Sequence, residues 1–186
     1  MTAALVDVLE RQHARIADLF DQVSRPDADR PRVLRSLIRE LAAHVASERA
    51  EVYPQVKSRR IGGESLAARL QGDYDEIDRL MVLIERRKFN YPDVPDLVSA
   101  LEDAFDAHRD RCRSQLEPAL RAALGPEEMA TIGERMSNAD KMVISHPHPH
   151  FLSLGPVSAR LTAFLARFDR WRDKTATSLP PPPRRP

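Results

Sequence analysis

The sequence predicts an all-α protein: an up-down-up-down four-helix bundle with extra C-terminal helices and a proline-rich tail. Apolar residues recur at intervals of three and four along several long segments, which is typical of amphipathic helices. No segment keeps the alternation of apolar and polar residues that indicates a strand. The loops between the first four helical segments are short, so consecutive helices are expected to run antiparallel.

An internal repeat organises the first two thirds of the chain. Five positions correspond at a distance of 64 residues, and four of them keep the same residue: Leu37, Leu41, Ala43, His44 and Pro54 fall opposite Leu101, Phe105, Ala107, His108 and Pro118. Upstream of each copy, residues 13–19 correspond to residues 74–80, which places His13 opposite Tyr74. The chain is therefore predicted to form two helical hairpins.

The bounds of the helices follow from breaks in the apolar pattern. The first helix is expected over about residues 3–22 and the second from near Pro31, because proline is tolerated in a first turn. Pro54 is expected to kink or end that second helix, because it lacks the amide proton that a helix interior needs. The third helix is expected over about residues 64–87, and the fourth from Pro95 or Asp96 to the turn at Gly125.

Beyond the fourth helix the sequence predicts two more helices, over about residues 126–142 and 155–172. Between them, the prolines of residues 145–150 exclude a helix, because each restricts the residue before it. We therefore divide the chain into a four-helix bundle at residues 1–124, a C-terminal helical extension with a His-Pro-His loop at 125–175, and a disordered Pro-rich tail at 176–186.

Charge and cysteine content limit the function. The formal net charge is +1 without long runs of one sign, which argues against nucleic acid or an anionic membrane as the main partner. The single cysteine, Cys112, suits a reducing compartment. The N-terminal residues do not resemble a signal peptide, and no apolar run approaches the roughly 18 residues that span a bilayer. We expect a soluble cytoplasmic protein.

Ionisable residues on apolar helix faces predict a metal site. His44 and Glu48 are four residues apart and so share one helix face, although such a pair is common by chance. His13, His44 and His108 lie on the apolar faces of different helices, at corresponding depths in the repeat, and Tyr74 takes the fourth place. Buried imidazoles are costly unless their nitrogens find partners, and a shared metal ion would satisfy them together. The predicted metal ligands are His13, His44, Glu48, Tyr74 and His108.

These motifs resemble the bacterial hemerythrin-like proteins with cation-binding His-His-Glu motifs. Residues 7–16 around His13 look like the first motif, and residues 44–48 followed by Pro54 look like the second. The resemblance covers residues 3 to about 150 and is greatest to the mycobacterial or actinobacterial subgroup, which shares a Pro-His-Pro segment like that around His148. Ligand type alone suits iron, manganese or zinc, whereas the resemblance implies non-haem iron.

The second copy of the repeat departs from the family pattern. Tyr74 stands where the family has a histidine, and Cys112 where it has a glutamate. Two alternatives therefore stay open: a site that binds one ion, and the two-iron centre that the subgroup retains. With two irons, the bridges would be Glu48 and an oxo or hydroxo group, and the terminal ligands His13, His44, Tyr74 and His108. The remaining position is open to Cys112, solvent, His146, His148 or His150, although a small buried apolar role is favoured for Cys112. Two roles stay open for Glu51, Asp75 and Asp78: each either supports a nearby metal ligand or is simply an exposed acid.

A tyrosine ligand bears on the reaction. A phenol with an ordinary pKa near 10 must lose its proton to bind a metal, and the resulting hard oxygen favours ferric over ferrous iron. That preference, with the activity associated with the subgroup, predicts a catalase-like oxidoreductase that decomposes hydrogen peroxide in oxidative-stress defence, with Tyr74 and Glu48 as catalytic residues. The alternatives are an O2, NO or iron sensor or carrier without turnover, and a metal-free helical interaction protein.

Overall fold

The chain forms the predicted bundle of antiparallel helices. A computed structural model describes residues 4–89 and 91–141, and these contain no strand. The helices are α1 (Leu5–Ser24), α2 (Arg30–Ser47), α3 (Tyr53–Arg59), α4 (Glu64–Arg86), α5 (Val94–Arg111), α6 (Glu117–Ala123) and α7 (Pro126–Lys141). The all-α, four-helix-bundle prediction is confirmed.

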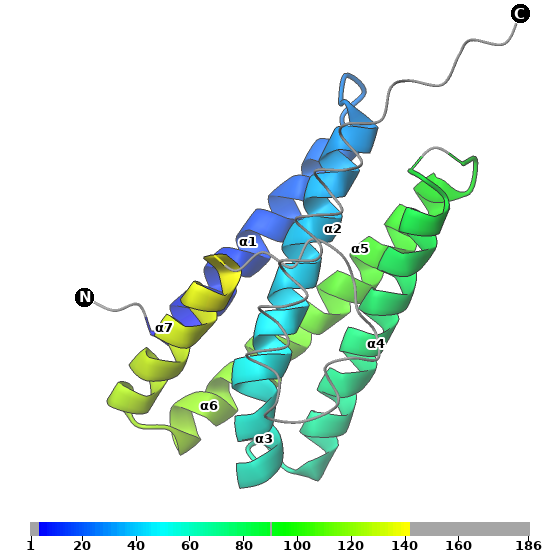
Figure 1. The fold of residues 1–186 in the computed structure, drawn as a ribbon. Helices are drawn as coiled ribbons and strands as arrows, with labels where there is room; N and C mark the ends of the chain where they lie inside the picture. Colours follow the sequence, from blue (N-terminus) through cyan, green and yellow to red (C-terminus); the bar gives the residue numbers. More distant parts are fainter. Residues whose placement is uncertain (1–3, 90, 142–186) are drawn as a thin grey trace, which may run out of the picture.

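The bundle consists of two helical hairpins. Helices α1 and α2 lie side by side, as do α4 and α5, and the loops that close both hairpins lie at the same end of the molecule (Figure 1). Helix α7 confirms the helix expected from residue 126 and packs along α1. The helix expected over 155–172, the His-Pro-His loop and the proline-rich tail lie outside the described residues. The division of the chain at residues 124 and 175 therefore stays a prediction.

The second and fourth helices of the bundle are each interrupted by a π-helical turn. The turn η1 (Glu48–Val52) joins α2 to α3, and η2 (Cys112–Leu116) joins α5 to α6. Of the two outcomes expected at Pro54, a kink or an end, the helix does not end there, since it continues to Arg59 after the π-helical interruption. Pro54 has no amide proton to donate, and the backbone widens just before it, so that the Tyr53 amide donates to the Glu48 carbonyl five residues back.

The internal repeat holds for every one of these boundaries. Helix α2, the turn η1 and α3 begin and end 64 residues before α5, the turn η2 and α6. Glu48 and Cys112 are thus the first residues of equivalent π-helical turns. Helix α5 begins at Val94, slightly before the expected Pro95 or Asp96, because Pro95 fits a first turn, where its missing amide proton needs no partner.

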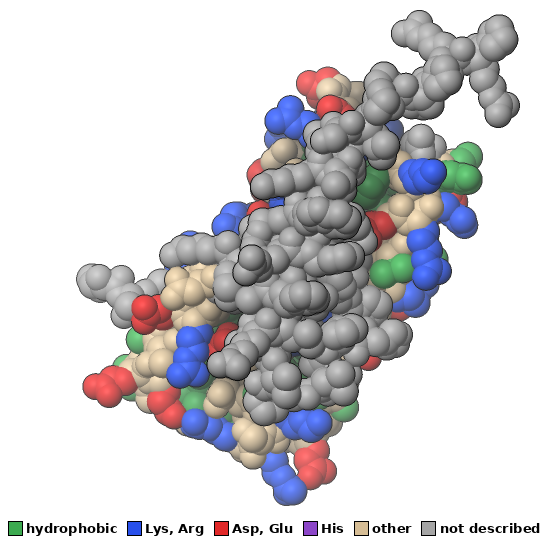
Figure 2. All heavy atoms as spheres, in the orientation of Figure 1, with side chains coloured by type: hydrophobic (Ala, Val, Ile, Leu, Met, Phe, Trp, Pro, Cys, Tyr) green, Lys and Arg blue, Asp and Glu red, His purple; other side chains and the backbone are tan. Residues whose placement is uncertain are grey.

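The apolar stripes of the helices meet in one core. The largest fully buried side chains are Tyr74, Phe20, Phe105, Leu5, Leu9, Ile16, Leu37, Ile38, Leu41, Leu66, Leu70 and Ile77. On the face shown in Figure 2, the described residues present intermixed Lys, Arg, Asp and Glu side chains, and no histidine is visible among them. None of the described helices is both long and apolar enough to cross a membrane.

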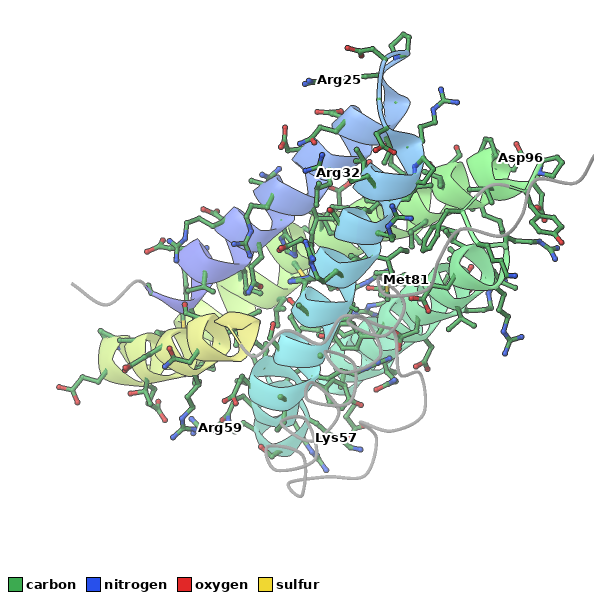
Figure 3. The ribbon with its side chains drawn as sticks, turned by 45° about the horizontal axis from the view of Figure 1, so that its top comes forward. Arg25, Arg32, Lys57, Arg59, Met81 and Asp96 are labelled. Atoms are coloured by element: carbon green, nitrogen blue, oxygen red, sulfur yellow. The ribbon has the colours of Figure 1, made fainter. Side chains whose placement is uncertain are left out.

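The start of α2 gives a test of the local structure. Asp29 caps this helix, since its side chain accepts a hydrogen bond from the Arg32 amide at 3.3 Å. Arg25 and Arg32 flank this loop, at the opposite end of the bundle from Lys57 and Arg59 (Figure 3). We expect Asp29→Ala to lower the free energy of unfolding by about 1 kcal/mol, measured by urea denaturation. Asp27→Ala, an exposed acid in the same loop, is the control, and equal losses in both variants would contradict the capping role.

Candidate metal centre

Four buried side chains from different elements meet in the middle of the bundle. His13 comes from α1, His44 from α2, Glu48 from the turn η1 and His108 from α5. Each is 3% exposed or less, and one ligand atom of each lies within 4.8 Å of those of the others. We call this group the His-Glu cluster. The structure thus brings together four of the five predicted ligands.

His44 is the central member of the cluster. Its Nε2 lies 3.2 Å from the Nε2 of His13 and 3.4 Å from the Nε2 of His108. The Oε2 atom of Glu48 lies 3.2 Å from the His108 Nε2 and 3.8 Å from the His44 Nε2. Metal to nitrogen bonds of about 2.0–2.1 Å separate neighbouring ligand atoms by about 3 Å, so these distances suit atoms around a shared cation.

The cluster fits a bound metal ion. The Nε2 atoms of three histidines face one another, so they cannot all carry protons without crowding like donors together. Glu48 Oε2 is buried, and its 3.2 Å contact with the His108 Nε2 does not have the geometry of a hydrogen bond. Buried polar atoms normally have a partner, and a cation would accept the lone pairs of all four groups at once.

Tyr74, the fifth predicted ligand, borders the cluster from α4. It is fully buried, its ring centroid lies 5.6 Å from that of His108, and its hydroxyl has no hydrogen-bond partner among the described residues. Burial raises the pKa of Tyr74 well above 10, and the neighbouring Glu48 and Cys112 raise it further. Without a metal Tyr74 is therefore a neutral phenol. The guanidinium of Arg49, 5.2 Å from the ring centroid, favours the phenolate and opposes that rise.

Cys112 occupies the place equivalent to Glu48. It is fully buried, with its Sγ 3.5 Å from the His108 Nε2 and 3.9 Å from the Glu48 Oε1. Burial, followed by the charge of Glu48, raises the pKa of Cys112 to about 11, so the group is a thiol at neutral pH. Its burial agrees with the favoured interpretation, a small apolar side chain. His146, His148 and His150, the other candidates for this position, lie outside the described residues.

Three members of the His-Glu cluster, His13, Glu48 and His108, have pKa values shifted from the ordinary ones. Burial, then the charge of His44, lowers the pKa of His13 from 6.5 to about 2, which keeps this imidazole neutral. Burial alone would raise the pKa of Glu48, but the charges of His108 and His44 outweigh it and hold it well below its usual range. For His108, burial alone would lower the pKa, but contacts with Cys112, Glu48 and Asp73 raise it well above 6.5. The directions of these two shifts, with the 3.2 Å contact, favour opposite charges on Glu48 and His108 in the metal-free protein.

Two residues that contact the cluster histidines, Gln12 and Asp73, were not among the residues predicted from the sequence. The Nδ1 of His44 donates a hydrogen bond to the Gln12 Oε1 at 2.9 Å. The Nδ1 of His108 lies 3.7 Å from the Oδ2 of Asp73, which Arg111 also contacts. The repeat held the signal that could have found them, because Gln12 and Asp73 directly precede the corresponding residues His13 and Tyr74.

Asp75, Asp78 and Glu51, the other acids near the predicted ligands, differ in burial and in their contacts. Asp78 is buried and forms an ion pair with Arg49, whereas Asp75 is exposed and lies 3.1 Å from the same guanidinium. Since Arg49 stacks on Tyr74, both acids hold a cation against the predicted ligand. Glu51 is partly buried, and burial raises its pKa.

Comparison with known proteins assigns the chain to a family. The family model described as the hemerythrin HHE cation binding domain matches residues 4–120, which is more than half of the 186 residues. No curated protein and no solved structure matches the chain. The matched range includes both hairpins and every member of the His-Glu cluster. On this match the chain belongs to the hemerythrin HHE cation-binding family.

Proposed function

We propose that the protein is a catalase-like non-haem iron enzyme that converts two molecules of hydrogen peroxide to two of water and one of O2. Two irons would be held by the His-Glu cluster and Tyr74, and Tyr74 and Glu48 are the catalytic residues. The observation that carries the proposal is the Tyr74 hydroxyl, which is fully buried beside the cluster without a hydrogen-bond partner among the described residues. The resemblance to the actinobacterial subgroup supports the same reaction and the count of two irons.

The position of Tyr74 favours peroxide chemistry over reversible oxygen carriage. A buried phenol beside Glu48 keeps its proton, so only a strongly attracting cation would displace that proton and bind the oxygen. A phenolate stabilises ferric iron more than ferrous iron, whereas an oxygen carrier needs a stable ferrous state. The same protein would therefore hold ferric iron at rest, ready to react with peroxide.

Bound iron would supply the redox chemistry, taking two electrons from one peroxide and returning them to the second. The chain's own residues orient the substrate. Glu48 directs Oε2 toward His108 and Oε1 toward Cys112. Its pKa is held well below the usual range, so it would act as a carboxylate anion that holds the metal and orients the substrate. Burial of all these side chains excludes bulk water from the reaction. Cys112 suggests a reducing compartment, and we place the reaction in the cytoplasm, in oxidative-stress defence.

Oxygen evolution by iron-loaded protein tests the proposal. We expect Tyr74→Phe to lower the rate at least about tenfold, which corresponds to about 1.4 kcal/mol in the barrier. Tyr53→Phe is the matched control, because the Tyr53 ring packs 6.3 Å from the Tyr74 ring but is not a predicted ligand. A wild-type rate no higher than that of free iron would overturn the proposal. Reversible binding of O2 or NO without oxygen evolution would instead support a carrier or sensor.

A visible spectrum of the same variants tests ligation by Tyr74 directly. Ferric phenolate absorbs in a broad charge-transfer band, so we expect the band in the wild type and in Tyr53→Phe and its loss in Tyr74→Phe. Metal analysis of these samples should give two irons per chain. A colourless iron-loaded wild type would contradict Tyr74 as a ligand.

A further inference from the structure

Gln12 and Asp73 hold corresponding places behind two histidines of the cluster. Each directly precedes the predicted ligand on the first helix of its hairpin, and each contacts the Nδ1 of the histidine on the second helix. The amide of Gln12 serves His44 in the first hairpin, and the carboxylate of Asp73 serves His108 in the second. A polar side chain thus contacts the histidine Nδ1 in both hairpins, but it is a neutral amide in the first and a carboxylate in the second.

We propose that Gln12 and Asp73 are equivalent positioning residues that direct the Nε2 atoms of His44 and His108 into the metal centre, and that Asp73 makes His108 the stronger donor. This inference rests on the metal centre of the proposed function but not on the peroxide reaction. A histidine that ligates through one ring nitrogen is oriented by the partner of its other nitrogen, and an anionic partner increases its basicity.

The hydrogen bond to His44 explains why a glutamine is buried at position 12. Gln12 is 2% exposed, and its Nε2 has no hydrogen-bond partner among the described residues. A buried amide nitrogen without a partner costs free energy, so a purely structural glutamine would be poorly placed here. Its Oε1 accepts the Nδ1 proton of His44 at 2.9 Å, which leaves the His44 Nε2 with a free lone pair.

Arg111 holds Asp73 in position behind His108. The Nε and one terminal nitrogen of Arg111 contact the two carboxylate oxygens at 2.7 and 3.1 Å. Such a two-point contact fixes the plane of a carboxylate. The first hairpin has no such cation at this place: Ser47, the counterpart of Arg111, donates instead to the His44 carbonyl at 2.9 Å. The outer partner of His44 is thus a neutral amide, and that of His108 is a carboxylate paired with Arg111.

The two halves exchange the position of their carboxylate. In the first hairpin Glu48 lies inside the cluster and the neutral Gln12 lies behind the histidine. In the second, the neutral Cys112 takes the inner place and Asp73 the outer one. The carboxylate of Asp73 increases the electron density that His108 can donate to a metal. It thereby offsets part of the negative charge that the second hairpin lacks at Cys112. This compensation predicts opposite effects of changing charge at the two outer positions.

Zinc binding to the full-length chain tests the inference without iron chemistry. We expect Asp73→Asn to weaken Zn2+ binding by roughly 10- to 100-fold, measured by competition with a chromophoric chelator. Glu76→Gln is the matched control, because this exposed acid on the same helix contacts Arg79 and not the cluster. Its affinity should stay within about twofold of the wild type, as for a surface change of about 0.5 kcal/mol. Asp73→Asn within that range would overturn the inference.

The reduction potential of the iron-loaded protein separates donor strength from structural support. Asp73→Asn should shift the potential in the positive direction and Gln12→Glu in the negative direction, whereas two merely damaged sites would not give opposite signs. Shifts of the same sign would overturn the inference. Absence of oxygen evolution with these effects intact would overturn only the peroxide reaction, and a wild type that binds neither metal would overturn both proposals.

Discussion

Glu48→Gln is expected to lower the free energy of unfolding of the metal-free protein by about 3–5 kcal/mol, the usual range when one partner of a buried ion pair is removed. Glu48 is 0% exposed, and its carboxylate lies 3.2 Å from the equally buried His108. The shifted pKa values of the two groups place opposite charges at this contact. In the variant, Asp73, at 3.7 Å, is the anionic partner that His108 retains among the described residues.

Urea denaturation near neutral pH, with a chelator present, measures this loss. Glu51→Gln is the matched control, since Glu51 lies in the same π-helical turn but is only partly buried. We expect the control to change the free energy by no more than about 0.5 kcal/mol. Glu48→Gln as stable as the control would show that Glu48 and His108 are not an ion pair in the metal-free protein.

The sequence was sufficient to predict the helices and most of the cluster. A helical period puts residues four apart on one face, so the sequence alone pairs His44 with Glu48, and the structure brings both into the cluster. The 64-residue repeat then placed His108 at the same depth on another helix. Hydrophobic periodicity and the repeat together fix which side chains face the core, and this is the information that the prediction required.

The π-helical turns could not be predicted in the same way. A proline within a helical pattern signals a kink, an end or a widened turn, and the sequence does not distinguish these outcomes. At Pro54 the helix widens, and the Tyr53 amide donates to the Glu48 carbonyl. The widened turn matters for the site, because it carries Glu48.

Gln12 and Asp73 were missed for a different reason. Each contacts a histidine on the next helix, so no spacing within one helix marks the pair. Periodicity predicts the face on which a polar residue lies, but not the rotamer that aims its oxygen at a given nitrogen. Comparison of the two hairpins gives the missing information. A polar residue directly precedes the predicted ligand in both copies, so both are candidates to contact a histidine of the cluster.

The stability of the metal-free protein is expected to be greatest near pH 6.5, because two histidines shift in opposite directions. The folded pKa of His13 is depressed to about 2, so below its ordinary value of 6.5 only the unfolded chain takes up this proton. Stability then falls with decreasing pH, by up to about 1.4 kcal/mol per pH unit. The folded pKa of His108 is raised, so its contribution is complete below 6.5 and is lost as the pH rises through the folded pKa.

His13→Gln isolates the acid side of this profile. Between about pH 5 and about pH 6.5 the variant should lose the slope that His13 contributes, while the decline above the maximum persists because His108 is unchanged. Urea denaturation at a series of pH values, with a chelator present, gives both limbs. Nitrogen NMR of the folded wild type should show His13 neutral throughout that range. If instead the acid limb is equally steep in the variant, His13 does not resist protonation, and the buried neutral imidazole that the metal site requires is absent.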